Sequence, residues 1–382
     1  MNHSCRVFLL ACLFSLSVEI APAKAGGTPA YSQVSQSELS QYYSGWKKRY
    51  LKPSVLVPGD YKIAFTPSGT TVSEAMGYGM LITVMMADAD PQARSFFDGL
   101  DRFRKRYPSK INPAFMAWKI PASEKTLSND SATDGDMDMA MALLMAYHRW
   151  GDVAYLAEAK KLIGEIGRSL VRSDGSLRLG DWDTDHSKRV MIRTSDLMPT
   201  HFRVFHKVTG DDLWSKVEKR GYDILRELQH NEAPVTGLVP DFAVLKKDAW
   251  QPAAPGALEG SHDGDYSYNA CRVPWRIGWE AIACEDDRAK AVLTLIMTWA
   301  KSAVGDPLEF KAGYHLDGKM LRGADFDSPA FIAPTGVAAL ALGDRTWSDA
   351  VYAYALKAHE GYYEDSVNLL SMLVMTGKAD LP

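Results

Sequence analysis

The chain has 382 residues with a formal net charge of −4 at pH 7, and 46% of its residues are hydrophobic. This mildly acidic balance excludes the strongly basic surfaces with which many proteins bind nucleic acid. After residue 25 no stretch is apolar for long enough to span a bilayer, which excludes a membrane-spanning protein. We therefore expect a globular monomer without a nucleic-acid or membrane partner.

The first 25 residues predict a secretory signal peptide. Arg6 precedes an apolar run over residues 7–18, and Ala23-Lys24-Ala25 supplies the small residues of a cleavage site. The apolar run is too short to cross a membrane. We expect cleavage near Ala25, a secreted or periplasmic protein, and a single domain over residues 26–382.

Two cysteines, Cys271 and Cys284, follow the predicted signal peptide. They could form one disulfide in an oxidising compartment. They could equally remain two buried thiols, since a chain of this length can be stable without a disulfide. The sequence leaves both possibilities open.

The helical pattern recurs along the whole of the remaining chain. Apolar residues near positions i, i+3, i+4 and i+7 predict about a dozen helices, over residues 37–50, 73–88, 93–107, 137–149, 153–172, 201–209, 211–230, 268–283, 288–304, 335–342, 347–359 and 363–376. Strand signals are few, and the short connections make neighbouring helices antiparallel. A closed ring of helical hairpins and an open solenoid both fit, but no repeat of fixed length supports the solenoid. A closed ring would place loops and helix N-termini at one end and so form a cleft.

Glu74 is the first candidate functional residue in chain order. Ser73 is a suitable N-cap, so Glu74 falls in the first turn of a helix, where a carboxylate is favourable. Such an acid is more often structural than functional. Gly77 and Gly79 then cost about 1 kcal/mol each relative to alanine, which indicates close approach of another backbone or of a ligand.

Three aspartates within five residues, Asp134, Asp136 and Asp138, precede a strongly apolar helical run. Carboxylates this close repel one another and resist burial, whereas a helix N-terminus accommodates negative charge. An acid-rich helix cap is one interpretation. A calcium loop is another, but Gly135 lies between the acids and no glutamate closes a loop of the required length.

The segment 250–279 mixes charged and aromatic residues in a loop rich in proline and glycine. It contains Glu259, Asp263, Asp265, Arg272 and Arg276 among Trp250, Tyr266, Tyr268, Trp275 and Trp279. We expect this mixture to be poor core material and suited to sugars, because flat rings lie under pyranose faces and charged groups bind hydroxyls. A structural aromatic corner with surface ion pairs is the alternative. Further candidates for substrate contact are Trp118, Trp182 and Trp214.

Taken together, these three elements resemble glycoside hydrolase family 8. Residues 132–136, followed by Met139-Ala140, Ala146 and Trp150, are similar to the family signature, and residues 73–80 and 268–276 to two further motifs. The resemblance covers about residues 38–376. It implies an all-α (α/α)6 barrel of about twelve helices. It also implies an endo-acting enzyme that inverts the anomeric carbon of β-1,4-linked glucan, mixed-linkage β-glucan, xylan or chitosan.

The resemblance also assigns roles to residues of this chain. Glu74 matches the general acid, Asp134 the acid that binds and distorts the sugar in the −1 subsite, and Tyr268 and Arg272 residues that line this subsite. We expect further substrate contacts from Asn269, Trp118, Trp182, Trp275 and Arg276.

The general base departs from the usual pattern of the family. Many members carry aspartate where this chain has Asn269, and an amide cannot take a proton from water. The chain resembles a branch of bacillus-type glucanases and chitosanases in which a glutamate of the preceding loop is the base, which implies Glu259. Asp263 and Asp265 remain alternatives.

The chemistry of inversion defines what these carboxylates must do. A protonated acid is needed beside the glycosidic oxygen, and an ionised base must hold a water roughly 6.5–9.5 Å away from it. We expect Asp134 to raise the pKa of Glu74 by like-charge repulsion, and Glu259 to deprotonate the water. No metal or other cofactor is needed for this reaction.

We expect β-glucan as the substrate, chitosan second and xylan third. Chitosan is a polycation, which would be attracted by an acid-rich cleft built from Asp134, Asp136, Asp138, Glu259, Asp263 and Asp265. The alternative to an enzyme is a glycan-binding protein that kept the groove and lost its general base.

Overall fold

The computed structural model describes residues 36–125 and 128–382, so the predicted signal peptide lies outside the described residues. In this part of the chain, twelve α-helices alternate between an outer and an inner layer. The outer helices are α1 (Gln36–Tyr50), α3 (Ala93–Arg106), α5 (Val153–Ser169), α7 (Leu213–Asn231), α9 (Asp287–Trp299) and α11 (Arg345–Ala355). The inner helices are α2 (Ser73–Met85), α4 (Thr133–Trp150), α6 (Pro199–Thr209), α8 (Val273–Cys284), α10 (Pro329–Ala341) and α12 (Tyr362–Met375).

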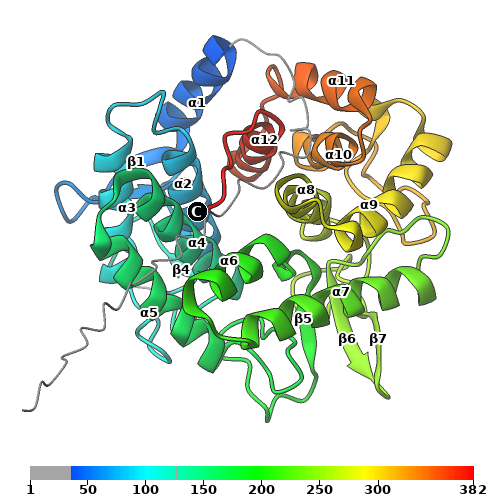
Figure 1. Cartoon of the computed structure of the whole chain (residues 1–382), viewed down its shortest axis with the longest axis horizontal. Coiled ribbons are helices and arrows are strands. Elements are labelled where there is room, and N and C mark those ends of the chain that lie inside the picture. The colour runs from blue at the N-terminus through cyan, green and yellow to red at the C-terminus, as the bar shows by residue number, and fades with distance from the viewer. Residues whose placement is uncertain (1–35, 126–127) are drawn as a thin grey trace, which may run out of the picture.

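The inner helices form a closed ring (Figure 1). Each contacts the next inner helix along the chain, and α12 returns to contact α2. Five outer helices pack against an inner helix adjacent to them in sequence, such as α3 against α2 and α5 against α4, whereas α1 packs against α12 at the other end of the chain. The contact between α12 and α2 excludes an open solenoid, and the predicted (α/α)6 barrel is confirmed.

Short strands connect the helices. Two antiparallel pairs, β1 with β2 and β3 with β4, consist of Leu51–Pro53 with Tyr61–Ile63 and of Thr71–Val72 with Lys119–Ile120. A three-stranded antiparallel sheet follows in the order β5 (Met191–Arg193), β6 (Phe242–Lys246) and β7 (Ala249–Pro252). Strand β3 continues directly into α2, and β5 ends at Arg193, which lies opposite Phe242 of β6.

Inner helices α2 and α10 are apolar around nearly their whole circumference because both of their sides are covered. In α2 every residue except Glu74 is buried, and in α10 every residue except Ala341. The outer helices bury one face, as an amphipathic surface helix does. The core therefore lies both between the two layers and inside the ring.

Segment 250–279 contributes to this core, contrary to the expectation that it is poor core material. Trp250, Tyr266, Trp275 and Trp279 are buried. Helix α8 lies in the inner ring, so large side chains are needed to fill the space on every side of it. The Trp279 indole donates a hydrogen bond to the carbonyl of Ala379 (2.9 Å), which satisfies its buried polar atom.

Two inner helices begin four or more residues earlier than periodicity predicts. Helix α4 begins at Thr133 and not at residue 137, because its aspartates lie within the helix and are paired there. Helix α10 begins at Pro329 and not at residue 335, with Pro329 in the first turn and Pro334 inside. Proline fits a first turn but usually breaks a helix interior, so a sequence pattern places the boundary after Pro334.

Glycines let α2 and α4 approach each other very closely. A Cβ atom added to Gly135 would lie 2.5 Å from the carbonyl carbon of Ser73, and one added to Gly77 would lie 2.7 Å from the Cβ of Asp138. The predicted close approach of another backbone at Gly77 is confirmed. This contact places the first turns of the two helices, with Glu74 and Asp134, side by side.

Replacing Gly135 by alanine is therefore expected to destabilise the protein by about 1–3 kcal/mol, because the new methyl group overlaps the Ser73 backbone. Activity should fall as well, since Glu74 follows Ser73. Urea denaturation measures the free energy of unfolding. Gly164→Ala on α5 is the control, because its Cβ would meet only the flexible Arg168 side chain at 3.5 Å. Equal stability of Gly135→Ala and wild type would contradict the account.

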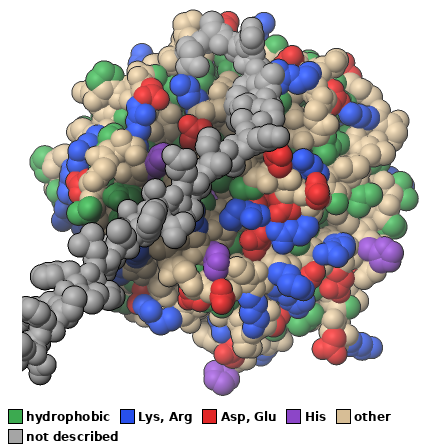
Figure 2. Space-filling model, in the orientation of Figure 1, with side chains coloured by type: hydrophobic (Ala, Val, Ile, Leu, Met, Phe, Trp, Pro, Cys, Tyr) green, Lys and Arg blue, Asp and Glu red, His purple; other side chains and the backbone are tan. Residues whose placement is uncertain are grey.

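The surface shows no segregation of charge on the face drawn in Figure 2, where basic and acidic side chains are interspersed. Among the described residues, no helix has both the length and the apolar character that a membrane crossing requires.

Candidate active site

A cleft of about 720 Å³ opens at the end of the barrel where inner helices α2, α4 and α12 begin. Six of the predicted site residues line it: Trp118, Glu74, Asp134, Glu259, Tyr268 and Asn269. The other lining residues are Phe65, Val72, Ser73, Lys119, Ala132, Arg193, Gly361, Tyr362, Tyr363 and Glu364. The cleft expected from a closed ring of helices is therefore present and contains three carboxylates assigned to catalysis.

Glu74 lies in the first turn of α2, directly after strand β3. Its Oε2 accepts a hydrogen bond from Nη1 of Arg272 (2.8 Å). Burial is the largest cause that raises its pKa, from an ordinary 4.5 to about 7; the Arg272 charge lowers this pKa in part and Asp134 raises it further. Like-charge repulsion by Asp134 thus acts as predicted, but burial has the larger effect.

This pKa predicts the alkaline side of the pH profile. If Glu74 donates a proton, only its protonated form is active, so kcat/KM should decrease above pH 7, by about tenfold per pH unit. Initial rates on a soluble oligosaccharide between pH 4 and 10 measure this profile. The residual activity of Glu74→Gln should lack the alkaline decrease; the same decrease in that variant would contradict the assignment.

Asp134 lies in the first turn of α4 and is held by two arginines. Its Oδ2 accepts a hydrogen bond from Nη1 of Arg272 (3.1 Å) and lies 3.2 Å from Nη1 of Arg193. Burial tends to raise the pKa of Asp134, but the charges of Arg193 and Arg272 outweigh it and lower this pKa below its ordinary value. Asp134 is therefore a buried, ionised carboxylate beside Glu74.

The other two aspartates of this helix point away from the cleft. Asp136 accepts a hydrogen bond from the backbone N–H of Met116 (3.1 Å), and burial raises its pKa well above the ordinary value. Asp138 is paired with Arg276 (2.5 Å) and with His201 (2.9 Å). The expectation that these carboxylates resist burial is wrong, because each one points to a different partner.

Glu259 is located in the loop between β7 and α8, and Arg193 and Asn269 hold its carboxylate. Its Oε1 lies 3.1 Å from Nη2 of Arg193, and its Oε2 accepts a hydrogen bond from Nδ2 of Asn269 (2.9 Å). The side chain is 49% exposed and faces the cleft. Glu259 is thus oriented by two donors while remaining accessible to water.

Asn269 links the two candidate catalytic glutamates. Its Nδ2 donates to Glu259, and its Oδ1 accepts from Nη2 of Arg272 (2.7 Å), whose Nη1 donates to Glu74. An amide has both a donor and an acceptor, which these two neighbours require. An ionised aspartate at this position would have no donor for Glu259 and would repel it.

The alternative bases, Asp263 and Asp265, do not line the cleft. Asp263 is buried and accepts hydrogen bonds from the backbone N–H groups of Leu258 (2.6 Å) and Gly260 (2.8 Å), so it shapes the loop that carries Glu259. Asp265 is flanked by two histidines. Of the three base candidates, Glu259 alone faces the cleft.

Arg193 and Asp241 are important residues of the site that sequence reasoning did not identify. Arg193 contacts both Asp134 and Glu259. Asp241 is buried and accepts hydrogen bonds from the backbone N–H groups of Asn269 (3.0 Å) and Ala270 (2.6 Å), which fixes the turn that carries Asn269. Residues 236–242, which contain Asp241, resemble a family segment, but no role was predicted for this aspartate, and Arg193 has no motif in its immediate sequence. The pairing of β5 with β6 brings both residues to the site.

The predicted aromatic contacts divide into three groups. Trp118 and Tyr268 line the cleft and are 39% and 37% exposed. Trp182, also 39% exposed, lines a second hollow of about 450 Å³ next to the cleft. Trp275 does not line the cleft but is buried in α8, and Trp214 is buried in α7.

The predicted arginines also occupy different positions. Arg272 lies directly under the cleft, where it contacts Glu74 and Asp134. Arg276 does not line the cleft; it is buried, stacks on the Trp275 ring at 4.0 Å from its centroid, and pairs with Asp138. The expectation that Trp275 and Arg276 contact substrate is therefore not supported by their positions. Arg276 follows Arg272 by one helical turn. Its side chain therefore lies deeper in the barrel, where it contacts Asp138 and does not reach the cleft.

The two cysteines are free thiols. Cys271 is buried beside the carbonyl of Tyr268 (3.3 Å), and Cys284 is half-buried at the end of α8. The disulfide left open by the sequence is not formed in this structure.

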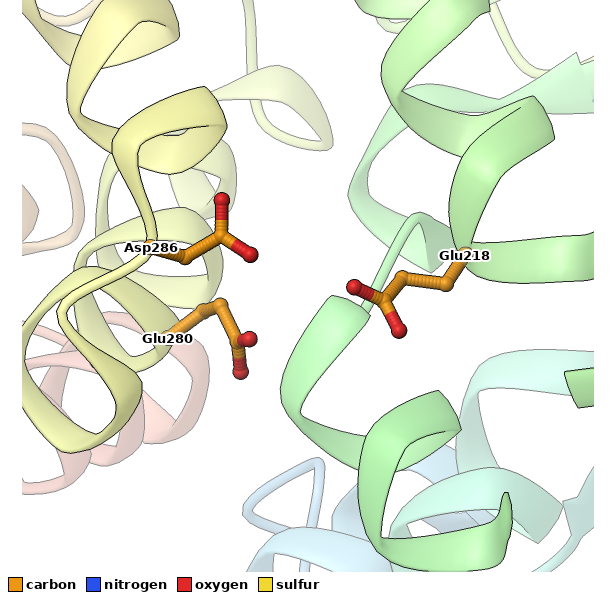
Figure 3. Close-up of side chains that lie close together, drawn as sticks. All are labelled: Glu218, Glu280 and Asp286. Carbon is orange, nitrogen blue, oxygen red and sulfur yellow. The ribbon is translucent and has the colours of Figure 1, made fainter. Parts of the chain in front are cut away.

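One cluster of carboxylates among the described residues has the spacing of a metal site: Glu218, Glu280 and Asp286 (Figure 3). Arg203 pairs with all three, and Arg288 pairs with Glu218 and Asp286. Two guanidinium groups already neutralise these acids, so the cluster is an ion-pair network that joins α6, α7 and α8. Glu280 lies in the last part of α8, away from the cleft end.

Comparisons with known proteins agree with this geometry. The family model described as "Glycosyl hydrolases family 8" matches residues 28–377. A β-glucanase from Niallia circulans is 41% identical over 89% of this chain and 84% of its own length, and an endoglucanase from Bacillus sp. (strain KSM-330) is 36% identical over 91% and 78%. The structure of a β-1,3-1,4-glucanase from Paenibacillus sp. X4 superposes with a TM-score of 0.86 at 40% identity, covering 91% of this chain and 94% of that one. The chain belongs to glycoside hydrolase family 8 and is a glycoside hydrolase.

Proposed function

We propose that this enzyme hydrolyses internal β-1,4 bonds of a β-glucan, of the mixed-linkage or cellulose type, with inversion of the anomeric carbon. The observation that supports this most strongly is that Glu74 and Glu259 line one cleft and are separated by Asn269 and Arg272. An inverting enzyme requires room for a water between its acid and its base, and in this proposal Asn269 and Arg272 hold the two carboxyl groups apart for that purpose. The β-glucanase and endoglucanase relatives support a β-glucan as the substrate.

In the proposed mechanism, Glu74 donates its proton to the glycosidic oxygen as the bond from this oxygen to C1 breaks. Glu259 takes a proton from a water whose oxygen forms the new bond to C1 on the opposite face, so the anomeric configuration is inverted. Asp134, ionised between two arginines, stabilises the positive charge that develops on the sugar ring.

Trp118 and Tyr268 are the proposed sugar platforms within the cleft. Both rings are partly exposed and line the hollow that contains Glu74 and Glu259. A flat ring that is open on one face can stack on the apolar face of a glucosyl unit.

The charges in the cleft support a neutral glucan more than chitosan. Of the six acids expected to make the cleft acidic, Asp134 and Glu259 line it, whereas Asp136, Asp138, Asp263 and Asp265 do not. Arg193 is paired with both Asp134 and Glu259, and Lys119 also lines the cleft. The other two lining acids are Glu74 and Glu364, and burial raises the pKa of each, which favours their uncharged forms. The electrostatic argument for a polycationic substrate is therefore weakened, and no observed contact favours xylan.

The proposal includes export of the enzyme. A polysaccharide cannot enter the cytoplasm, and residues 1–25 match a cleavable signal peptide. Both the polymeric substrate and the N-terminal segment therefore support a location outside the cytoplasm.

Hydrolysis of four polymers tests the proposed function. Purified wild-type protein is incubated with barley mixed-linkage β-glucan, carboxymethyl cellulose, chitosan and xylan, and reducing-sugar release and viscosity are measured. We expect rapid cleavage of β-glucan with an early fall in viscosity, which marks internal cutting, and much slower release from chitosan and xylan. Binding to a polymer without cleavage of any of them would instead favour a glycan-binding protein.

A further inference from the structure

The hollow of about 450 Å³ beside the cleft has a composition that the proposed chemistry does not use. Its lining includes the exposed side chains of Trp182, Lys188 and Arg189 together with Leu258. Its volume is within the range of small-ligand sites, about 300–1,000 Å³. An open aromatic ring with two cations beside it can bind a sugar that carries negative charge.

This hollow is the direct neighbour of the catalytic cleft. Leu258 lines the hollow and Glu259, the next residue, lines the cleft. On the other wall, the carbonyl of Leu179 in the hollow accepts a hydrogen bond from the N–H of Thr133 (3.1 Å), which follows cleft residue Ala132. A polysaccharide chain in the cleft can therefore extend past the Glu259 loop into the hollow.

The Trp182 ring packs closely against the backbone at Gly180. A Cβ atom added to Gly180 would lie 2.7 Å from the Trp182 indole nitrogen and would also overlap the carbonyl oxygen of Ser131. The residue between them, Asp181, is buried and accepts a hydrogen bond from the Ser131 N–H (2.8 Å). This packing anchors the turn beneath the ring and leaves the ring partly exposed.

Among the described residues, the two cations of the hollow have no ion-pair partner. Asp183 also lines it, but its carboxylate is paired with Arg172 and accepts the Leu179 N–H (3.2 Å). Across the residues that the structure describes, neither Lys188 nor Arg189 forms an ion pair. Exposed cations are ordinarily solvated and bind nothing else; here both line the same hollow as a partly exposed aromatic ring.

We propose that this hollow binds a glucosyl unit that carries a carboxylate, so that the enzyme prefers acidic β-glucans. The guanidinium of Arg189 can bind a carboxylate with two hydrogen bonds, and Lys188 adds a second positive charge. This inference rests on the proposed function, because the hollow extends the same cleft. The carboxylate can be a substituent on a sugar or the C6 group of a uronic acid.

The test compares Lys188→Gln/Arg189→Gln with wild type on carboxymethyl cellulose and on neutral hydroxyethyl cellulose. We expect KM for carboxymethyl cellulose to rise about fivefold, and kcat/KM on hydroxyethyl cellulose to stay within about twofold. Sodium chloride at 0.5 M should remove most of the difference on the acidic polymer, because salt screens exposed charges. Equal changes on both polymers, or no change on either, would overturn the inference.

Two controls make the outcome specific. Lys160→Gln/Lys161→Gln on outer helix α5 removes the same charge from exposed positions and should leave both KM values unchanged. Cellulose oxidised at C6 is compared with carboxymethyl cellulose, and the polymer whose KM rises more identifies the position of the carboxylate.

Affinity electrophoresis separates failure of the inference from failure of the proposed function. Glu74→Gln, with and without the double substitution, is run in gels that contain each polymer. Weaker retardation by carboxymethyl cellulose upon the double substitution supports the inference even if wild type hydrolyses neither polymer. Unchanged retardation refutes it even if wild type hydrolyses both.

Discussion

Replacing Glu74 by glutamine is expected to lower kcat on mixed-linkage β-glucan by about a thousandfold, with little change in KM. The amide has nearly the same shape and can still accept the hydrogen bond from Arg272, so the cleft keeps its structure. It has no acidic proton for the departing sugar. Initial rates of reducing-sugar release over a range of polymer concentrations measure both constants.

A substrate with a good leaving group distinguishes loss of the acid from loss of structure. The bond to 2,4-dinitrophenolate breaks with little need for protonation, so Glu74→Gln should lose about tenfold or less on a 2,4-dinitrophenyl cello-oligosaccharide. Circular dichroism melting checks that the fold is retained. A thousandfold loss on this substrate as well, in a folded variant, would contradict proton donation by Glu74.

Replacing Glu259 by alanine is expected to lower kcat by a similar factor, about a thousandfold, because Glu259 is the one of the three base candidates that faces the cleft. The shorter side chain leaves space in which a small anion can act in place of the activated water. Sodium azide should therefore restore turnover and give an α-glycosyl azide from a β-linked substrate. The rate and the product are measured by chromatography and NMR.

Two neighbouring carboxylates provide the matched controls. Asp265→Asn should retain activity within a few-fold, since Asp265 does not line the cleft. Asp263→Asn should lose activity because Asp263 shapes the loop that carries Glu259, but azide should not restore it while Glu259 still occupies the space. Azide rescue of Asp263→Asn, with activity retained in Glu259→Ala, would move the base to Asp263.

Much of the fold is predictable because helical periodicity is a local signal. In a closed ring each helix must bury at least one face, so apolar residues recur at helical spacing along the entire chain. The beginnings of α4 and α10 were not predictable from this signal. Their first turns contain aspartates and prolines, whose partners and positions depend on other parts of the fold.

The catalytic carboxylates could be found from motifs, and so could Arg272 and Asn269, which contact Glu74 and Glu259, whereas Arg193 could not. Arg193 follows two apolar residues at the end of a short strand, and only pairing of that strand with β6 brings it to Glu259. Trp275 and Arg276 are residue types that are typical of a sugar-binding site, but they belong to α8, which is covered on all sides. Composition alone does not tell which face of a helix reaches the cleft.

Asn269 shows how a structural contact changes the interpretation of one residue. From the sequence alone, the amide at this position indicates only that the usual aspartate base is missing. In the structure it donates to Glu259 and accepts from Arg272, two contacts that an ionised aspartate could not make together. The amide therefore suits a site whose base comes from the preceding loop.

The stereochemistry of the first product tests the central claim most directly. Proton NMR follows hydrolysis of a cello-oligosaccharide by wild-type enzyme from the first minutes, before mutarotation mixes the anomers. A single displacement by water between Glu74 and Glu259 predicts that the α-anomer appears first and the β-anomer later. Initial appearance of the β-anomer would show a double displacement with retention and would contradict the single displacement and the role of Glu259 as a base.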